Sequence, residues 1–166
     1  RFQSIPITRE PTLAKSAAYG QLYNGHTMLD GRGLCPVGWH VPSESDWEDL
    51  VAHVSEQSAM GVEVEGWNGM AHWEVGQFLK DSCCWLPPRL LALDEFKPTN
   101  DYGFKAIPSG ERSFSGFFLD AGVYGSAKWW SSDLVGNELR WRYVTSIDSA
   151  LHEAQAMRTR GFAVRC

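Results

Sequence analysis

The sequence lacks several patterns that define large classes of proteins. No apolar run approaches the roughly 18 residues of a membrane-spanning helix, so we expect no direct insertion into a membrane. Basic residues are in the minority, with 15 Lys and Arg against 20 Asp and Glu and a net charge of −5. Nucleic-acid binding relies on clustered Lys and Arg that contact phosphates, so we also expect no nucleic-acid partner.

Motifs for metal binding and catalysis are missing too. The four cysteines are not spaced as CxxC pairs, which argues against a zinc ribbon. The five histidines form neither an HxH nor an HExxH motif. We therefore predict no metal, no cofactor and no catalytic residue. We also see no signal-peptide pattern, so composition alone does not predict a location.

Glycine and tryptophan are abundant, with 16 and eight copies. So many glycines favour turns and short strands over a helical bundle. The length of 166 residues suits one domain with a sizeable core, and 43% of the residues are apolar. We expect this domain to span residues 19–166, and residues 1–18 to be an edge strand or a linker.

A capped helix is the clearest local prediction. Pro42 disfavours helix before it, Ser43 is a typical N-cap, and Asp46 puts a negative charge in the first turn. Apolar residues at helical spacing follow, which predicts a helix over about 44–57. Similar spacing predicts a second, shorter helix over about 71–80.

Short strands dominate the second half. The strand at 139–144 alternates between Leu139, Trp141 and Tyr143 on one face and Arg140, Arg142 and Val144 on the other. We expect the first face to be buried and the second to be exposed. Two helices followed by several short strands predict an α+β domain, with a long loop over 81–100.

Five blocks of sequence occur in the order found in one family. They are Tyr19-Gly-x-Leu-Tyr-Asn24, Leu34-Cys-Pro-x-Gly-Trp-His-Val-Pro-Ser43, Gly103-Phe-x-Ala-x-Pro108, Trp129-Trp-Ser-Ser132 and Gly161-Phe-x-Val-Arg-Cys166. On these blocks the chain resembles the Fibrobacter succinogenes major paralogous domain, within the C-type lectin-like fold group. The resemblance covers about residues 19–166, with 85–100 outside it.

The resemblance implies a fold, a location and a binding surface. The implied fold is C-type lectin-like, with two helices packed on a small twisted antiparallel sheet and the chain ends close together. The implied location is secreted or surface-attached, or virion-associated. Relatives in this fold group include ligand-binding proteins diversified by retroelements. Their variable residues lie between the Trp-Ser-Ser block and the final strand, a span that corresponds here to Asp133 to Arg160.

The candidate ligand-binding residues come from this span and the block before it. They are Trp129, Asp133, Asn137, Arg140, Arg142, Val144, His152, Met157, Arg158 and Arg160. Of the neighbours Trp129 and Trp130, at least one must be buried, because adjacent strand residues point to opposite faces. The Arg140 face is interpreted either as a solvated edge or as the floor of an interface. Its basic character suggests an acidic partner.

Calcium-dependent sugar binding is not expected. C-type lectins use a Glu-Pro-Asn or Gln-Pro-Asp motif with Trp-Asn-Asp, whereas this chain has Lys97-Pro-Thr-Asn-Asp101. A lysine therefore replaces the first oxygen ligand, and a hard cation needs several oxygens close together.

The cysteines lead to two predictions. We expect Cys35 and Cys166 to form a disulfide that ties the last strand to the turn before the capped helix. The adjacent Cys83 and Cys84 are interpreted as buried or partly buried free thiols, with a strained, reducible bond as the alternative.

Three functions follow from these observations. The first is a non-catalytic domain of a secreted or surface protein that binds a protein or carbohydrate ligand through residues 133–160. The second is an assembly or structural domain of a larger surface protein. The third, which has least support, is a thiol oxidoreductase that uses Cys83 and Cys84.

Overall fold

The computed structural model describes residues 4–5, 19–58, 63–66, 69–86, 98–122 and 125–166. The elements in chain order are β1 (Ser4–Ile5), β2 (Leu22–Asn24), the 3-10 helix η1 (Gly25–Leu29), α2 (Glu44–Ser58), β3 (Glu63–Gly66), β4 (Gly69–His72), α3 (Val75–Leu79), β5 (Ser109–Arg112), β6 (Phe118–Ala121), β7 (Ser126–Val135), β8 (Glu138–Thr145), β9 (Leu151–Met157) and β10 (Gly161–Phe162).

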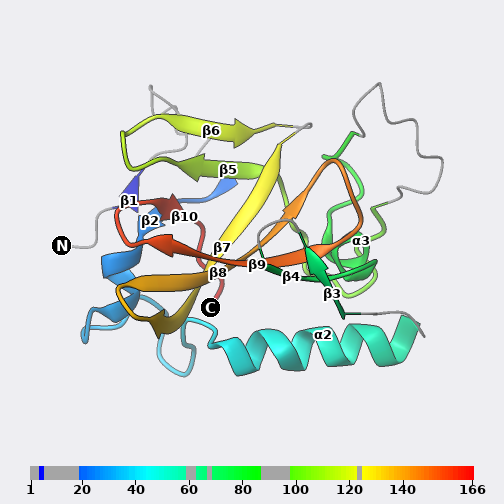
Figure 1. Cartoon of the computed structure of the whole chain (residues 1–166), viewed down its shortest axis with the longest axis horizontal. Helices are drawn as coiled ribbons and strands as arrows, with labels where there is room; N and C mark the ends of the chain where they lie inside the picture. Colours follow the sequence, from blue (N-terminus) through cyan, green and yellow to red (C-terminus); the bar gives the residue numbers. More distant parts are fainter. Residues whose placement is uncertain (1–3, 6–18, 59–62, 67–68, 87–97, 123–124) are drawn as a thin grey trace.

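A ten-stranded mixed sheet organises these elements. Its strand order is β1-β2-β10-β5-β7-β8-β9-β4-β3, and β6 pairs with β5 off this path. Strands β7, β8 and β9 are the longest and form an antiparallel meander, with Trp130 opposite Trp141 and Trp141 opposite Ala154. In Figure 1 this meander lies between the β5–β6 hairpin above and α2 below. The described part of the chain is therefore mostly β.

The predicted fold class is wrong on this evidence. We expected two helices on a small antiparallel sheet, but the only long helix among the described residues is α2, with 15 residues. The sheet is large, and β5 pairs with β7 in parallel. The second predicted helix shrinks to the five residues of α3, because Gly69–His72 forms β4 and pairs with β9. Cross-strand pairing has overridden the local helical spacing at this point.

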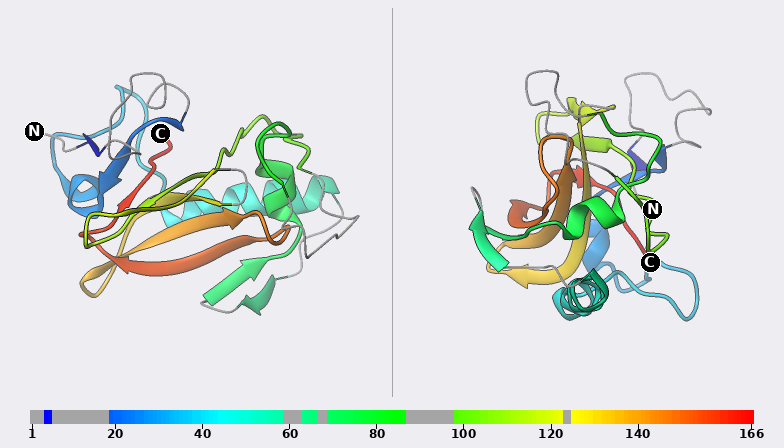
Figure 2. Two further views of the ribbon diagram at one scale, coloured as in Figure 1. Left: turned by 90° about the horizontal axis from the view of Figure 1, so that it is seen from above. Right: turned by 90° about the vertical axis from the view of Figure 1, so that its right-hand side faces the viewer.

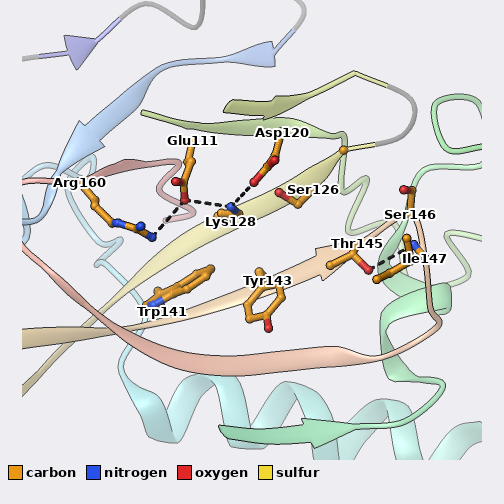
Figure 3. Close-up of a pocket in the computed structure, with 11 residues that line it drawn as sticks. Glu111, Asp120, Ser126, Lys128, Trp141, Tyr143, Thr145, Ser146, Ile147 and Arg160 are labelled. Carbon is orange, nitrogen blue, oxygen red and sulfur yellow. Dashed lines mark hydrogen bonds and ion pairs between the residues drawn. The ribbon is translucent and has the colours of Figure 1, made fainter. Parts of the chain in front are cut away.

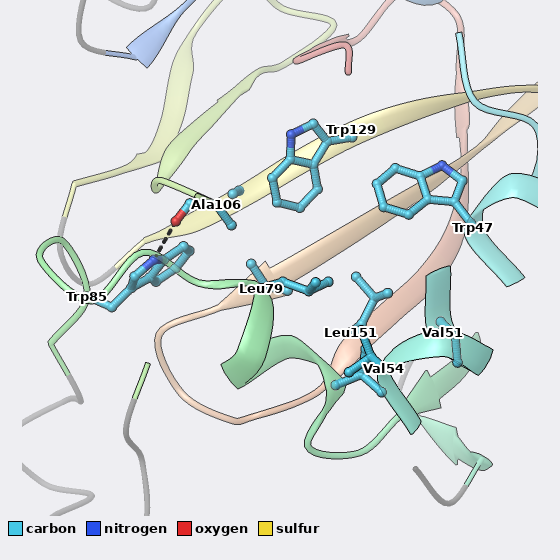
Figure 4. Packing of buried hydrophobic residues seen from close by; sticks show 11 residues of the cluster. Trp47, Val51, Val54, Leu79, Trp85, Ala106, Trp129 and Leu151 are labelled. Carbon is cyan, nitrogen blue, oxygen red and sulfur yellow. Dashed lines mark hydrogen bonds between the residues drawn. The ribbon is translucent and has the colours of Figure 1, made fainter. Parts of the chain in front are cut away.

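The capped helix is confirmed. Ser43 Oγ accepts a hydrogen bond from the Asp46 amide at 3.3 Å, and Asp46 Oδ2 accepts one from the Ser43 amide at 2.7 Å. This reciprocal pair satisfies two amides that the helix itself leaves without partners. The apolar stripe of α2 then packs on the sheet, with Trp47 2% and Val54 0% exposed (Figure 4). Figure 2 shows α2 lying along one side of the sheet.

The core has two parts, one on each face of the central strands. The cluster under α2 includes Trp47, Trp129, Leu79 and Leu151 (Figure 4). The cluster on the other face consists of Trp130, Leu139, Trp141, Ala156 and Phe162. The neighbours Trp129 and Trp130 are 5% and 0% exposed, so both are core residues and β7 is buried on both faces.

The two ends of the chain meet at β2, which pairs with β1 on one side and β10 on the other. Beyond β10, Ala163 continues alongside β7 through hydrogen bonds with Lys128 and Trp130. Cys166 then forms a disulfide with Cys35, the pairing expected from the sequence. Of the predicted edge strand at 1–18, Ser4–Ile5 forms β1 and the rest lies outside the described residues, as does much of the predicted 81–100 loop.

No helix in the described ranges combines the length and the apolar character needed to cross a membrane.

Candidate functional site

The Arg140 face of β8 is not exposed as predicted. Arg140, Arg142 and Val144 do share one face, but that face turns toward α2 and the core. Arg142 is 1% exposed and forms ion pairs with Glu44 at the start of α2 and with Glu153 on β9. Val144 is 0% exposed in the cluster beneath α2, and Trp129 is buried in the same cluster. The prediction that Arg142 and Val144 lie on an exposed face is therefore wrong.

Asp133 also has a structural role. Its Oδ2 atom accepts hydrogen bonds from the Glu44 amide at 2.7 Å and from Ser131 Oγ at 3.0 Å. The carboxylate therefore ties the end of β7 to the first turn of α2, where a negative charge is favourable.

The remaining predicted residues lie in separate places. Arg158 hydrogen-bonds Asn137 near the β7–β8 turn, and Met157 is 64% exposed at the end of β9. His152 hydrogen-bonds Asp148 at 3.0 Å. Arg160 lines a pocket on the opposite face of the meander from α2. The predicted set thus does not form one continuous surface.

This pocket is the candidate functional site. It is an open hollow of about 470 Å³ on the face of β7 and β8 that α2 does not cover (Figure 3). Strands β5 and β6 form one wall, and the loop from β8 to β9 forms part of the rim. It is lined by Glu111, Asp120, Gly125, Ser126, Lys128, Trp141, Tyr143, Thr145, Ser146, Ile147 and Arg160.

Four charged side chains form one wall of the pocket. Lys128 Nζ donates to Glu111 Oε2 at 2.9 Å and to Asp120 Oδ2 at 2.8 Å. Arg160 Nη1 approaches the same Glu111 oxygen at 3.4 Å (Figure 3). The Lys128 and Glu111 side chains are only 9% and 3% exposed, whereas that of Asp120 is 56% exposed. The wall therefore presents donors and acceptors alternately, with no net charge.

A row of stacked rings forms the floor. The centroids of Trp141 and Tyr143 lie 4.6 Å apart, those of Tyr143 and His152 also 4.6 Å, and those of Trp141 and Phe162 4.7 Å. Lys128 Nζ lies over the Trp141 ring, 5.7 Å from its centroid. The floor therefore packs against the charged wall as well as against the neighbouring rings.

Three buried polar atoms of the lining have no hydrogen-bond partner. They are Ser126 Oγ, Ser146 Oγ and Trp141 Nε1, and their residues are 5%, 1% and 8% exposed. Buried polar groups in folded proteins nearly always have a protein or water partner. Each of the three atoms has less than 1 Å² of accessible surface, so a guest in the pocket does not reach them.

The pocket rim is anchored from beneath. Gln77 on α3 donates its amide proton to Ser149 O at 3.0 Å, and the buried Lys80 Nζ donates to Asp148 O at 2.5 Å. Burial lowers the pKa of Lys80 to about 7, with the charge of Asp148 opposing the shift. Although burial raises the pKa of Asp148, hydrogen bonds from His152 and the Ala150 amide outweigh it and lower that pKa overall. The loop therefore rests on the buried amino group of Lys80.

We expect Lys80 to make stability rise with pH. Its folded-state pKa of about 7 lies below the ordinary value of 10.5, so between these values the unfolded chain binds more protons than the folded one. Relative to Lys80→Met, the wild-type free energy of unfolding should increase above pH 7 by up to about 1.4 kcal/mol per pH unit. Urea denaturation of both proteins at pH 6 to 9 measures this difference. Parallel pH profiles would contradict it.

Cys83 and Cys84 form a disulfide with each other, so the prediction of two free thiols is wrong. The bond lies in an exposed turn, where the Cys83 amide donates to Asp81 Oδ1 at 3.0 Å. Asp81, Cys83 and Cys84 bring possible metal ligands within 4.8 Å of one another, but the disulfide occupies both sulfurs.

Sequence reasoning missed Glu111, Asp120 and Lys128, which lie on the three consecutive strands β5, β6 and β7 with no recognisable motif between them. The one local signal is Lys128 itself, because a lysine within the apolar run Ala127–Trp130 needs a buried partner.

Comparison with known proteins gives one match. A family model described as the Fibrobacter succinogenes major domain matches residues 4–166, which is nearly the whole chain and includes the segments that the sequence blocks left out. No curated protein and no solved structure matches the chain. The chain therefore belongs to the Fibrobacter succinogenes major domain family.

Proposed function

We propose that this chain is a non-catalytic ligand-binding domain of a secreted or surface protein, and that its ligand is a saccharide group bound in the pocket lined by Glu111, Lys128 and Trp141. The row of alternating cations and carboxylates along the pocket wall, Arg160–Glu111–Lys128–Asp120, is the observation that carries this proposal.

The chemistry of the wall supports a saccharide. A sugar hydroxyl both donates and accepts hydrogen bonds, so it can meet both the carboxylates and the cations of one wall. An ion of either sign would face two groups of like charge in the Arg160–Glu111–Lys128–Asp120 row. The volume of about 470 Å³ falls within the range of about 300–1,000 Å³ typical of small-molecule sites.

The same geometry favours binding over hydrolysis. A glycoside hydrolase needs one of two carboxyl groups to donate a proton to the leaving group. Here the two pocket carboxylates, Glu111 and Asp120, both accept hydrogen bonds from Lys128. In this arrangement the two carboxylates keep the Lys128 ammonium group in place and act as hydrogen-bond acceptors.

A glycan array followed by calorimetry with the best-bound glycan tests the proposal. Asp120→Asn and Arg160→Gln should weaken binding about tenfold, since each removes part of the accessible polar lining. Arg158→Gln is the matched control, because Arg158 hydrogen-bonds Asn137 outside the pocket. If no glycan binds, the saccharide is wrong. If a glycan binds both pocket variants as tightly as wild type, the pocket is not its site.

An assembly domain is the second candidate. The β5–β6 hairpin exposes Phe114, Phe117 and Leu119, which are 72%, 55% and 45% accessible. Clustered exposed apolar residues are typical of protein contacts. If the hairpin mediates self-assembly, sedimentation should show that the wild type associates as its concentration rises. The double variant Phe114→Ser, Phe117→Ser should not associate. A wild type that stays monomeric throughout would exclude self-assembly through this hairpin.

A further inference from the structure

A second pocket lies on the other face of β7, where Trp129 points away from Lys128. It has a volume of about 230 Å³ and lies between the segment before β5, the chain after β10 and the residues before β2. Its lining consists of Tyr19, Gly20, Gln21, Lys105, Ile107, Ser109, Trp129, Ala163, Val164 and Arg165. We propose that this pocket is an anion site that binds a carboxylate, sulfate or phosphate group through Arg165 and Lys105.

The charge of this pocket differs from that of the first one. Two of its lining residues are basic and none is acidic. Within the described parts of the chain, neither Arg165 nor Lys105 has a carboxylate within 4.0 Å, whereas Lys128 and Arg160 in the first pocket are both paired. Two basic side chains beside one hollow, neither paired with a carboxylate among the described residues, create a positive potential that attracts an anion.

Arg165 is held firmly for this role. Its guanidinium lies 4.3 Å from the centroid of Phe104, and that ring packs edge-on against Trp129 at 5.2 Å. Ala163 fixes the backbone before it through hydrogen bonds to β7, and the Cys166 disulfide fixes the backbone after it. Burial lowers the pKa of Arg165, which means that its environment penalises the positive charge. A bound anion would offset this penalty.

Lys105 is fixed in a similar way. Its backbone is left-handed, with φ 54°, a conformation that non-glycine residues seldom adopt. The Lys105 amide donates to Asn100 Oδ1 at 2.7 Å, and the next residue, Ala106, donates its amide proton to Leu79 O at 2.9 Å. These two hydrogen bonds hold the backbone of Lys105 in its left-handed conformation and so fix the position of its Cα atom.

Neutral polar groups complete the lining. Tyr19, Gln21 and Ser109 each carry a group that can donate a hydrogen bond. A guanidinium binds a carboxylate, sulfate or phosphate with two parallel hydrogen bonds, while a lysine adds a point charge. The site is therefore suited to the oxyanion group of a larger molecule as well as to a free anion.

Amide chemical shifts measured during titration with sodium sulfate, sodium phosphate and sodium acetate test this inference, with sodium chloride at matched ionic strength as the reference. Saturable shifts are expected at residues 19–21, 105–109 and 163–165. Saturation by acetate alone would indicate a carboxylate ligand, and saturation by sulfate and phosphate a tetrahedral one.

Two pocket variants and one control complete the test. Arg165→Gln and Lys105→Gln should each weaken binding about tenfold, or about 1.4 kcal/mol, and Arg158→Gln should leave it unchanged. Arg165→Lys keeps the charge without the paired hydrogen bonds and should weaken binding less than Arg165→Gln does. Shifts that grow linearly with salt, or equally in wild type and Arg165→Gln, would overturn the anion site. The first pocket is not involved, so failure here leaves the proposed function standing.

Discussion

Replacing Cys35 and Cys166 by serine should lower the free energy of unfolding by about 5 kcal/mol. The disulfide joins residues 131 positions apart, so it restricts the unfolded chain over most of its length. On the chain-entropy model, the stabilisation grows with the logarithm of the loop that the bond closes. Urea denaturation followed by tryptophan fluorescence measures the loss. Adding a reductant to the wild-type protein should produce a similar decrease.

The matched control is Cys83→Ser with Cys84→Ser. This pair is adjacent in sequence, so its disulfide closes no long loop and should contribute far less to stability. If the two double variants lose the same free energy of unfolding, the Cys35–Cys166 bond does not stabilise the protein by restricting the unfolded chain. A loss below about 1 kcal/mol in the first variant would show that the bond contributes little.

Arg142→Met should destabilise the protein by about 3–5 kcal/mol. Arg142 is 1% exposed and forms ion pairs with Glu44 on α2 and with Glu153 on β9. Burial lowers the pKa of Arg142, and the charge of Glu153 opposes this shift. Removing the guanidinium leaves two largely buried carboxylates without their shared cation, and an uncompensated buried charge is costly. Chemical denaturation measures the effect.

Two further variants distinguish the loss of a buried positive charge from the loss of side-chain packing. Arg140→Met removes a more exposed cation that also pairs with Glu153, so it should cost less than about 1 kcal/mol. Adding Glu44→Leu to Arg142→Met should restore part of the lost stability, because one of the two stranded charges is removed. A double variant less stable than Arg142→Met would contradict the charge argument.

Local rules predicted part of this fold well. The capping pair Ser43 and Asp46 and the apolar stripe after it defined α2 almost to its ends, since a helix is set by residues within a few positions of one another. The strand at 139–144 also lies within β8. The β3–β4 hairpin could not be foreseen, because β4 depends on pairing with β9, about 80 residues further along the chain.

The candidate site could not be predicted for the same reason, because it also depends on contacts between residues that are distant in sequence. Alternation in β8 correctly separated Trp141 and Tyr143 from Arg142 and Val144, but period-two patterning does not say which face meets solvent. The arginine suggested an exposed face, whereas α2 supplies Glu44 and allows Arg142 to be buried. The pocket itself depends on three strands that no short motif connects, so Glu111 and Lys128 showed no relation until the sheet was known.

The bond between residues 35 and 166 also makes most of this molecule a closed covalent ring. A protease nick at the exposed turn Gly136–Asn137 would produce two fragments that stay joined by sulfur. β7 would belong to one fragment and β8 to the other, yet their pairing in the sheet would hold both in place. Any single cut between Cys35 and Cys166 would likewise leave both sides of the cut covalently joined.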